Sequence, residues 1–330
     1  MRCTNKRWKR TGCLFLAAVF CSLLLAGCTK TVQPDDAFTV EHPELGIQSR
    51  DNDRDISYFA KDLCVANENV ELEGADASDA LAACFFHLDT KEVLYAKNVH
   101  DRLYPASTTK IMTALVALEH GDLDAQTTVS EEAVTFHESG VSTAKLKKGD
   151  VLTLRQLLYA LLLVSANDAA NVIAEQIAGS SEQFVAMMNE EARKIGATHT
   201  HFVNPNGLHD EEHYTTAYDL YLIFQKALQY EFFAEVLQEA VYEASYISAD
   251  GTSIEESWSS TNLFTNGDVT VPDGVTAMGG KTGTTTAAMS CLVQLFEDKS
   301  KDRYVAIILG CQERATLYRE MQSFLSDLNN

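Results

Sequence analysis

The segment that most constrains this chain is a short run in its first half, residues 104–110, with the sequence YPASTTK. Pro105 favours a helix start immediately after it, because its fixed φ suits the first helical turn. The apolar residues that follow recur at steps of three and four, so we expect one face of this helix to be buried. Ser107 and Lys110 are three residues apart and therefore lie on one side of the helix. The run predicts a buried helix that presents a hydroxyl and an amine together near its N-terminus.

This pair has the chemistry of a nucleophile and its base. A serine hydroxyl is a weak nucleophile until a neighbouring base takes its proton, and a desolvated lysine can be that base. Free backbone N–H groups at a helix start can also stabilise developing negative charge. Ser-x-x-Lys is nevertheless common on surface helices, so the pair alone does not establish a site.

Two later segments supply the partners that such a site needs. Residues 163–168 read LVSAND and place Ser165 and Asn167 after a strongly apolar run, and residues 279–284 read GGKTGT. Ser-x-x-Lys, then Ser-x-Asn, then Lys-Thr-Gly is the order found in serine enzymes that react with penicillin. Chance agreement of three ordered, widely spaced motifs is remote, so we expect the fold to bring the three segments together.

The order of predicted elements indicates an α+β fold. Strand-like apolar patterns occupy residues 81–88, 93–96, 275–281, 288–296 and 304–310. Helical patterns occupy residues 153–164, 168–178, 184–195, 216–228 and 313–328. Strands at both ends with helices between them imply a sheet completed by both ends of the domain, with a helical lobe inserted.

The N-terminus has the pattern of an export signal. A basic start without acidic residues precedes the apolar run 13–26, which is too short for a comfortable membrane span. The run ends in Leu-Ala-Gly-Cys28, which resembles a bacterial lipobox, where cleavage precedes a diacylated cysteine. An uncleaved anchor is the alternative, and either way the domain would lie on the outer face of the cytoplasmic membrane. We expect a lipoprotein signal peptide at 1–27, a lipidated cysteine and acidic tether at 28–79, and the enzyme domain at 80–330.

Composition limits the partners. The 47 acidic residues exceed the 26 basic ones, giving a net charge of −21, which disfavours nucleic acid and anionic lipid headgroups. Beyond Cys28, four cysteines remain: Cys64, Cys84, Cys291 and Cys311. They form no metal-type Cys-x-x-Cys, and we expect buried free thiols. A disulfide between two of them stays open, because an exported domain permits one.

On these motifs the chain resembles the serine D-alanyl-D-alanine carboxypeptidases, which are low-molecular-weight penicillin-binding proteins. The likeness runs from about Leu81 to Gly310 and includes PASTTKIMTA, SANDAA and FVNPNGL. It implies a β-lactamase/transpeptidase-like fold, with an antiparallel sheet flanked by helices and an all-helical subdomain. It also implies removal of the C-terminal D-alanine from peptidoglycan stem pentapeptides, inhibition by β-lactams, and no cofactor or metal.

The resemblance implies catalytic roles for three residues. Ser107 would be the acylated nucleophile, and Lys110 its general base. Ser165 would relay a proton towards the leaving D-alanine.

The resemblance also implies how the substrate would be held. Asn167 would bind the substrate amide, and Lys281, on an edge strand, would supply positive charge that helps to keep Lys110 neutral. The hydroxyls of Thr282 and Thr284 would bind the terminal carboxylate. Backbone N–H groups of Ser107 and Thr284 would form the oxyanion hole.

Three alternatives compete with this interpretation. A class A β-lactamase shares all three motifs, but it deacylates with a glutamate in a Glu-x-x-Leu-Asn segment, which is missing between residues 167 and 281. A catalytically silent wall-binding lipoprotein is the second. A metal hydrolase is the third, because His209 and His213 are four residues apart, as on a zinc helix. No His-Glu-x-x-His accompanies them, and we expect both to be surface histidines.

Overall fold

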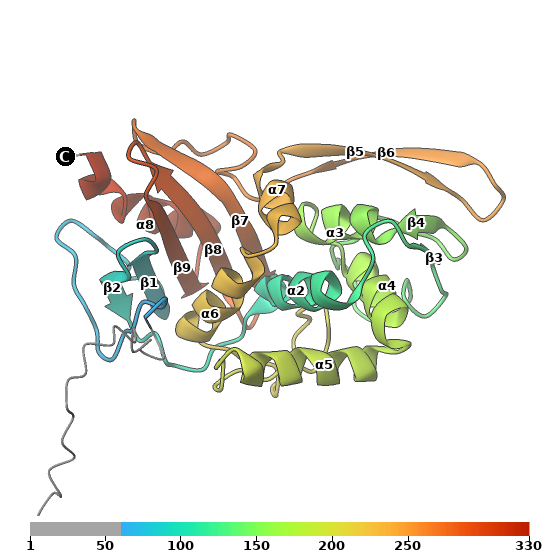
Figure 1. The fold of residues 1–330 in the computed structure, drawn as a ribbon, viewed down its shortest axis with the longest axis horizontal. Coiled ribbons are helices and arrows are strands. Elements are labelled where there is room, and N and C mark those ends of the chain that lie inside the picture. Colours follow the sequence, from blue (N-terminus) through green and yellow to red (C-terminus); the bar gives the residue numbers. More distant parts are fainter. Residues whose placement is uncertain (1–60, 330) are drawn as a thin grey trace, which may run out of the picture. The chain divides into compact units, whose positions relative to one another are not determined.

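Five antiparallel strands form the main sheet, in the order β2-β1-β9-β8-β7, in the computed structural model of this chain, which describes residues 61–329 (Figure 1). The strands are β1 (Ala82–His87), β2 (Glu92–Lys97), β7 (Val275–Thr285), β8 (Met289–Asp298) and β9 (Arg303–Cys311). Both ends of the domain therefore contribute to one sheet, as the order of elements predicted. Strand β7 lies at one edge.

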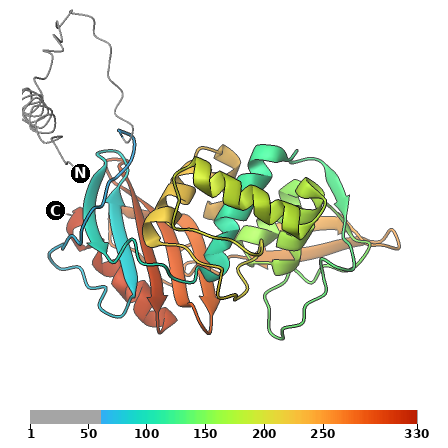
Figure 2. The same cartoon turned by 90° about the horizontal axis from the view of Figure 1, so that it is seen from below.

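The central strands are buried on both faces, which explains their continuous apolar runs. Successive residues point to opposite faces, so Phe85 and Phe86 of β1 enter two different cores. Phe85 packs in the cluster that contains Leu317 and Met321 of helix α8 (Arg314–Ser323). Phe86 packs on the other face, in the cluster that includes the helical lobe. Figures 1 and 2 show the sheet between these two layers.

The helical lobe is built around helix α2 (Lys110–His120). Residues Lys110 to Ala117 of α2 are all buried, because four other helices pack against it. Those four are α3 (Leu154–Leu162), α4 (Asn167–Ala178), α5 (Ser181–Lys194) and α6 (Ala217–Ala227). A further helix, α7 (Glu231–Gln238), was not predicted from the sequence and packs against α3 and β7. The predicted all-helical subdomain is thus present, with α2 as its core.

A second sheet of four strands was also not predicted. Its order is β3 (Gln126–Thr128), β4 (Val151–Thr153), β5 (Val241–Ile247) and β6 (Ser253–Ser259). Strands β3 and β4 are three residues long, too short to show a periodic pattern. Tyr242 of β5 stacks on Tyr159 of α3 at 3.8 Å between ring centroids, and Trp258 of β6 stacks next to Tyr242. This aromatic ladder fastens the β5–β6 hairpin to the lobe.

Residues 61–79, which were expected to belong to the tether, pack against the domain. The Cys64 N–H donates to the Tyr221 hydroxyl at 2.9 Å, and Val70 forms an antiparallel bridge with Ala96. The compact unit therefore begins upstream of residue 80.

The predicted signal peptide and Cys28 lie outside the described residues. Among residues 61–329, none of the helices has the length and apolar character that a membrane crossing requires. The four cysteines within that range are free and buried, as expected from the sequence.

Candidate active site

Ser107 lies on a short 3-10 turn, Ala106–Thr109, that runs directly into α2. Pro105 precedes the turn, and its carbonyl accepts the Thr108 N–H at 3.2 Å. Ala106 has a φ of +49°, in the left-handed region that residues with a Cβ rarely occupy. The predicted helix start is present, but it begins as this strained turn rather than as a regular α-helical turn.

Lys110 is fully buried and contacts the nucleophile. Its Nζ lies 3.0 Å from Ser107 Oγ, 2.7 Å from Asn167 Oδ1 and 2.5 Å from the Asn206 carbonyl oxygen. Burial, and next the positive charge of Lys281, holds the pKa of Lys110 well below its ordinary value. An amine that loses its proton readily therefore touches the Ser107 hydroxyl.

Ser165 and Asn167 lie in the tight connection between α3 and α4. Ser165 has a φ of +58° and is buried, and Asn167 is the first residue of α4. Because Lys110 occupies Asn167 Oδ1, the amide Nδ2 of Asn167 is the group that remains for a substrate.

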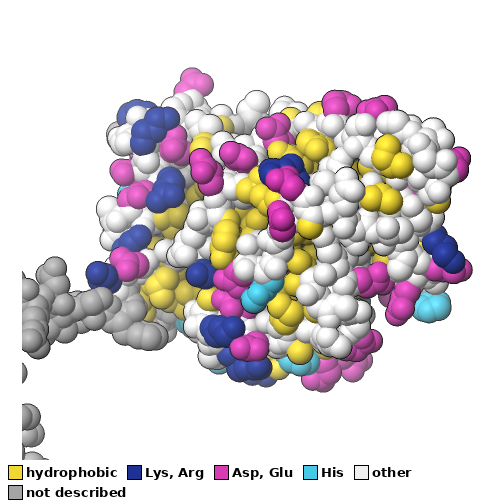
Figure 3. Space-filling view, turned by 45° about the vertical axis from the view of Figure 1, so that its right-hand side comes forward, with side chains coloured by type: hydrophobic (Ala, Val, Ile, Leu, Met, Phe, Trp, Pro, Cys, Tyr) yellow, Lys and Arg dark blue, Asp and Glu magenta, His cyan; other side chains and the backbone are white. Residues whose placement is uncertain are grey.

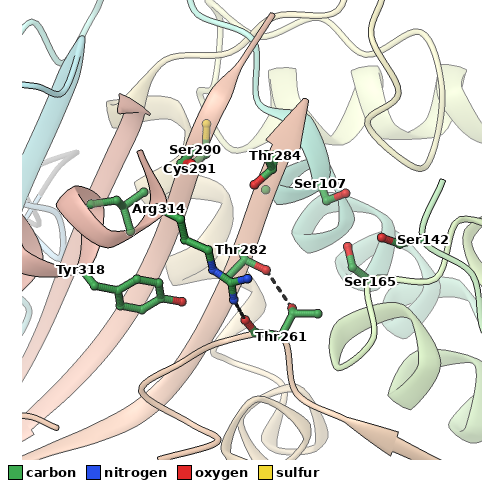
Figure 4. Close-up of a pocket in the computed structure, with 12 residues that line it drawn as sticks. Ser107, Ser142, Ser165, Thr261, Thr282, Thr284, Ser290, Cys291, Arg314 and Tyr318 are labelled. Carbon is green, nitrogen blue, oxygen red and sulfur yellow. Dashed lines mark hydrogen bonds between the residues drawn. The ribbon is translucent and has the colours of Figure 1, made fainter. Parts of the chain in front are cut away.

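The loop 140–146 is tied to the same connection. The Asp168 carboxylate accepts the N–H groups of Ala144 and Leu146 at 2.9 and 3.0 Å. The Asn167 N–H donates to the Ser142 carbonyl at 2.8 Å. These bonds hold Ser142 at the rim of the site, where Figure 4 shows its hydroxyl near those of Ser107 and Ser165.

Lys281 links the second motif to the third. It lies on edge strand β7, as predicted, and its fully buried Nζ donates to Ser165 Oγ at 3.0 Å and to the Thr282 carbonyl at 2.8 Å. Burial lowers the pKa of Lys281 to about 7. The Thr282 hydroxyl pairs with that of Thr261 at 2.8 Å.

Gly283 allows β7 to lie directly against the nucleophile turn. A Cβ at this position would be 2.9 Å from the Pro105 carbonyl oxygen and 3.0 Å from the backbone nitrogens of Ser107 and Thr108. Only a residue without a side chain fits such an approach. The close contact places the next residue, Thr284, beside Ser107.

The predicted residues surround one cavity of about 340 Å³. Ser107, Ser165, Thr282 and Thr284 line it (Figure 4). Lys110, Asn167 and Lys281 are buried in the adjoining wall and reach it through the contacts above. The structure therefore brings together all the site residues that were predicted between Ser107 and Thr284.

Several cavity residues were not predicted. Ser142, Thr261 and Arg314 also line the cavity, and the Arg314 guanidinium donates to the Thr261 carbonyl (Figure 4). The Asn206 carbonyl, which contacts Lys110, lies in the segment FVNPNGL. That segment was noted in the sequence, but the other three are isolated residues with no motif around them.

The prediction of two surface histidines was wrong for His213. This residue is 2% exposed and hydrogen-bonded to Thr109 Oγ1 at 2.8 Å, whereas His209 is exposed. Among residues 61–329, no cluster of three or more His, Cys, Asp or Glu side chains is placed to hold a metal ion.

Known proteins resemble this chain over most of the described residues. The family described as D-alanyl-D-alanine carboxypeptidase matches residues 69–313. The D-alanyl-D-alanine carboxypeptidase DacF of Bacillus subtilis is 34% identical over 256 residues, which are 75% of this chain and 62% of the relative. The D-alanyl-D-alanine carboxypeptidase DacB2 of Mycobacterium tuberculosis is 35% identical over 243 residues, 73% of this chain and 78% of the relative.

A solved structure shows the same fold. The crystal structure of the Streptomyces K15 DD-transpeptidase matches with a TM-score of 0.70 at 28% identity, covering 76% of this chain and 97% of that one. The predicted α+β, transpeptidase-like fold class is confirmed. The matched part of this chain spans less than two thirds of the length of the Bacillus relative.

Proposed function

This chain belongs to the D-alanyl-D-alanine carboxypeptidase family, and we propose that it removes the C-terminal D-alanine from peptidoglycan stem pentapeptides through an acyl-enzyme on Ser107. One observation carries the proposal: Ser107 Oγ lies 3.0 Å from the amine of a fully buried lysine whose pKa is lowered. A hydroxyl in contact with an amine that loses its proton easily is an activated nucleophile.

The partners of Lys110 determine where its lone pair points. A neutral amine has two N–H groups and one lone pair. A carbonyl oxygen can only accept hydrogen bonds, so Asn206 and the side-chain oxygen of Asn167 take both N–H groups. The lone pair is left for the Ser107 hydroxyl. Lys110 therefore takes the Ser107 proton as the serine oxygen attacks the carbonyl carbon of the penultimate D-alanine.

The tetrahedral intermediate then needs a charge partner and a proton. The backbone N–H groups of Ser107 and Thr284 receive the oxyanion, at roughly 3 kcal/mol for each donor. Ser165, which accepts a hydrogen bond from the Lys281 amine, passes its hydroxyl proton to the nitrogen of the leaving D-alanine and takes a replacement proton from Lys281. The C–N bond breaks, the ester on Ser107 forms, and the amino acid leaves.

Positive charge beside the hydroxyls selects a ligand that ends in a carboxylate. The hydroxyls of Thr282 and Thr284 bind the carboxylate. Positive charge comes from Lys281, which is buried and bonded to the Thr282 carbonyl, and from Arg314, which lines the cavity. Asn167 Nδ2 holds the amide of the stem peptide. Penicillins carry a carboxylate and a reactive amide in a similar arrangement, so they acylate Ser107 as well.

The fate of the acyl-enzyme separates this activity from that of a β-lactamase. The penicilloyl ring stays tethered to Ser107 and blocks water, and the chain has no Glu-x-x-Leu-Asn segment between residues 167 and 281 to activate that water. D-Alanine diffuses away and water enters the cavity. Once Lys110 has released to this water the proton that it took from Ser107, it can accept a proton from the water molecule that hydrolyses the peptidyl ester. We expect hydrolysis of the peptide and a long-lived penicilloyl adduct.

The test follows both ligands with one protein. The wild type should release D-alanine from a pentapeptide and retain labelled penicillin on the peptide that contains Ser107. Ser107→Ala should lose both reactions with an unchanged unfolding midpoint. Ser245→Ala, which changes an exposed serine of β5, should keep both. Rapid penicillin turnover without D-alanine release would contradict the proposal, as would labelling of another serine.

The N-terminal sequence supports a further part of the proposal. The basic start, the short apolar run and the ending Leu-Ala-Gly-Cys28 support export and lipid attachment. The enzyme would then act at the outer face of the cytoplasmic membrane, where peptidoglycan is its substrate.

A further inference from the structure

His213 is a buried polar residue that the proposed reaction does not use. It lies in a segment held from two sides, since Tyr214 forms a bridge with His201 and Thr215 forms one with Leu103. Leu103 precedes the nucleophile turn by a few residues. The segment therefore brings the His213 ring against the nucleophile turn, within hydrogen-bond distance of Thr109.

The hydrogen-bond partners of His213 determine which of its ring nitrogens accepts and which donates. The Val203 N–H donates to Nδ1 at 3.3 Å, and Nε2 lies 2.8 Å from Thr109 Oγ1. A backbone N–H can only donate, so Nδ1 carries the lone pair and the neutral ring has its proton on Nε2. Nε2–H then donates to Thr109 Oγ1, whose own proton goes to the Ala106 carbonyl at 2.8 Å. A directed chain runs from His213 through Thr109 to Ala106.

The Ala106 carbonyl is held unusually tightly. Besides the Thr109 hydroxyl, Gly207 packs against it so closely that a Cβ there would lie 1.9 Å from the carbonyl oxygen. Ala106 itself has the strained φ of +49°. Strained backbone persists only where the surroundings hold it, and here two different segments do so.

This carbonyl shares a peptide plane with the N–H of Ser107. In a planar trans peptide the C=O and N–H bonds point in opposite directions, so fixing one fixes the other. The Ser107 N–H is one of the two proposed oxyanion donors. Its direction is therefore set by whatever holds the Ala106 carbonyl.

We propose that His213 is a positioning residue that, through Thr109 and the Ala106 carbonyl, directs the Ser107 N–H into the cavity. The inference rests on the proposed function. His213 does not line the cavity. Its loss should slow the acylation step and leave the initial binding of ligand unchanged, because the oxyanion forms only after attack.

This chain of hydrogen bonds requires a neutral imidazole. Protonation would add a hydrogen at Nδ1, and two N–H donors, those of His213 Nδ1 and Val203, would then face each other. The pKa of His213 is lowered to about 4, mainly by burial. The Asp210 carboxylate acts in the opposite direction, and His201, Lys110 and His209 lower the pKa further. The neutral chain is therefore intact at neutral pH.

Two substitutions distinguish the contribution of Nε2 from that of Nδ1. In His213→Gln the amide nitrogen occupies the place of Nε2 and still donates to Thr109. In His213→Asn the side-chain oxygen occupies the place of Nδ1 and accepts the Val203 N–H, but the side chain is too short to reach Thr109. Both remove the ring and its packing on Phe202, so they form a matched pair.

The measurement is the acylation rate constant with a labelled penicillin, separated from its initial dissociation constant. We expect His213→Gln to stay within about threefold of the wild type and His213→Asn to acylate at least about tenfold more slowly, with an unchanged dissociation constant. Thr109→Val should reproduce the loss and Thr109→Ser should restore the rate. The Thr109 pair decides the question if the His213 variants do not fold.

Equal acylation rates for the folded Gln and Asn variants, or for Thr109→Val and the wild type, would overturn the inference. A wild type that no penicillin acylates would instead contradict the proposed function. In that case the ¹⁵N spectrum of the His213 ring still tests the inference, because a proton on Nδ1 at neutral pH is incompatible with the proposed chain of hydrogen bonds.

Discussion

At the scale of single residues, the proposed reaction needs two buried lysines beside one cavity to differ in protonation, one neutral and the other charged. In the proposed reaction, Lys110 is neutral so that it can accept the Ser107 proton, whereas Lys281 is charged so that it can attract a carboxylate. Burial lowers both pKa values, and the charge on Lys281 lowers that of Lys110 further. The active form therefore exists between two titrations, whose apparent pKa values belong to the pair.

The alkaline limit of this range is a testable prediction. Because the pKa of Lys281 is about 7 in the free protein, its proton is present below that pH and is lost above it. We expect the second-order rate constant of acylation to fall as pH rises through about 7. Lys281→Arg should move that fall well above pH 9, since arginine stays charged.

Lys281→Ala serves as the control for charge. It should lower the rate at pH 6 by about 10- to 100-fold, the worth of a hydrogen bond to a charged group. The measurement is labelled-penicillin acylation between pH 5 and 9. The same alkaline fall in Lys281→Arg and in the wild type would assign the titration to another group.

At the scale of elements, the site depends on the contact between β7 and the nucleophile turn. Gly283 lies 2.9–3.0 Å, measured from a hypothetical Cβ, from three backbone atoms of residues 105–108. Backbone atoms of a strained turn cannot move aside as the end of a flexible side chain can. The separation between Thr284 and Ser107, the two proposed oxyanion donors, therefore depends on the absence of a side chain at Gly283.

We predict that Gly283→Ala forces the strand away from the turn. Acylation should slow by about 100-fold, because a displacement of about 1 Å is enough for such a loss. Stability should fall by about 1–3 kcal/mol from overpacking.

Gly121→Ala is the matched control. It would bring a Cβ to 2.3 Å from Leu154 Cδ2, at the C-terminus of α2 and away from the cavity. It should therefore lower the unfolding midpoint while each folded molecule acylates normally. Comparable acylation by both alanine variants would show that the strand contact does not control the site.

At the scale of the whole molecule, the cavity lies where the main sheet meets the helical lobe, a common position for ligand sites. The sheet supplies β7, and the lobe supplies Ser107, Lys110 and Ser165. The net charge is −21, and acidic side chains are spread over the face shown in Figure 3. The overall field repels the proposed ligand, which ends in a carboxylate, so the proposal relies on local positive charge from Lys281 and Arg314 to attract it.

The proposed anchor is also a property of the whole molecule. Cys28→Ser should prevent lipid attachment, so the protein should appear in the soluble fraction or as an unprocessed precursor of larger mass. Two or three acyl chains hold a protein firmly, whereas one does not. Cys21→Ser, seven residues upstream in the apolar run, should leave processing unchanged. Identical fractionation and migration of Cys28→Ser and the wild type would refute lipidation at this cysteine.

The sequence by itself determined the parts of this protein that rest on local patterns. The motif residues from Ser107 to Thr284 could be named because their chemistry depends on short fixed spacings, and the main strands and helices because their apolar residues recur with a regular period. The end strands could be assigned to one sheet because a buried strand needs a partner.

Only the tertiary structure decided the features that depend on contacts between distant segments. Strands β3 and β4 are too short to have a pattern of their own, and they exist because β5 and β6 extend their sheet. Arg314 reaches the cavity because α8 begins beside Thr261. His213 is buried because the chain folds back against Leu103 and the nucleophile turn. Burial of a polar residue by remote segments leaves no periodic signal, so the sequence could not distinguish His213 from exposed His209.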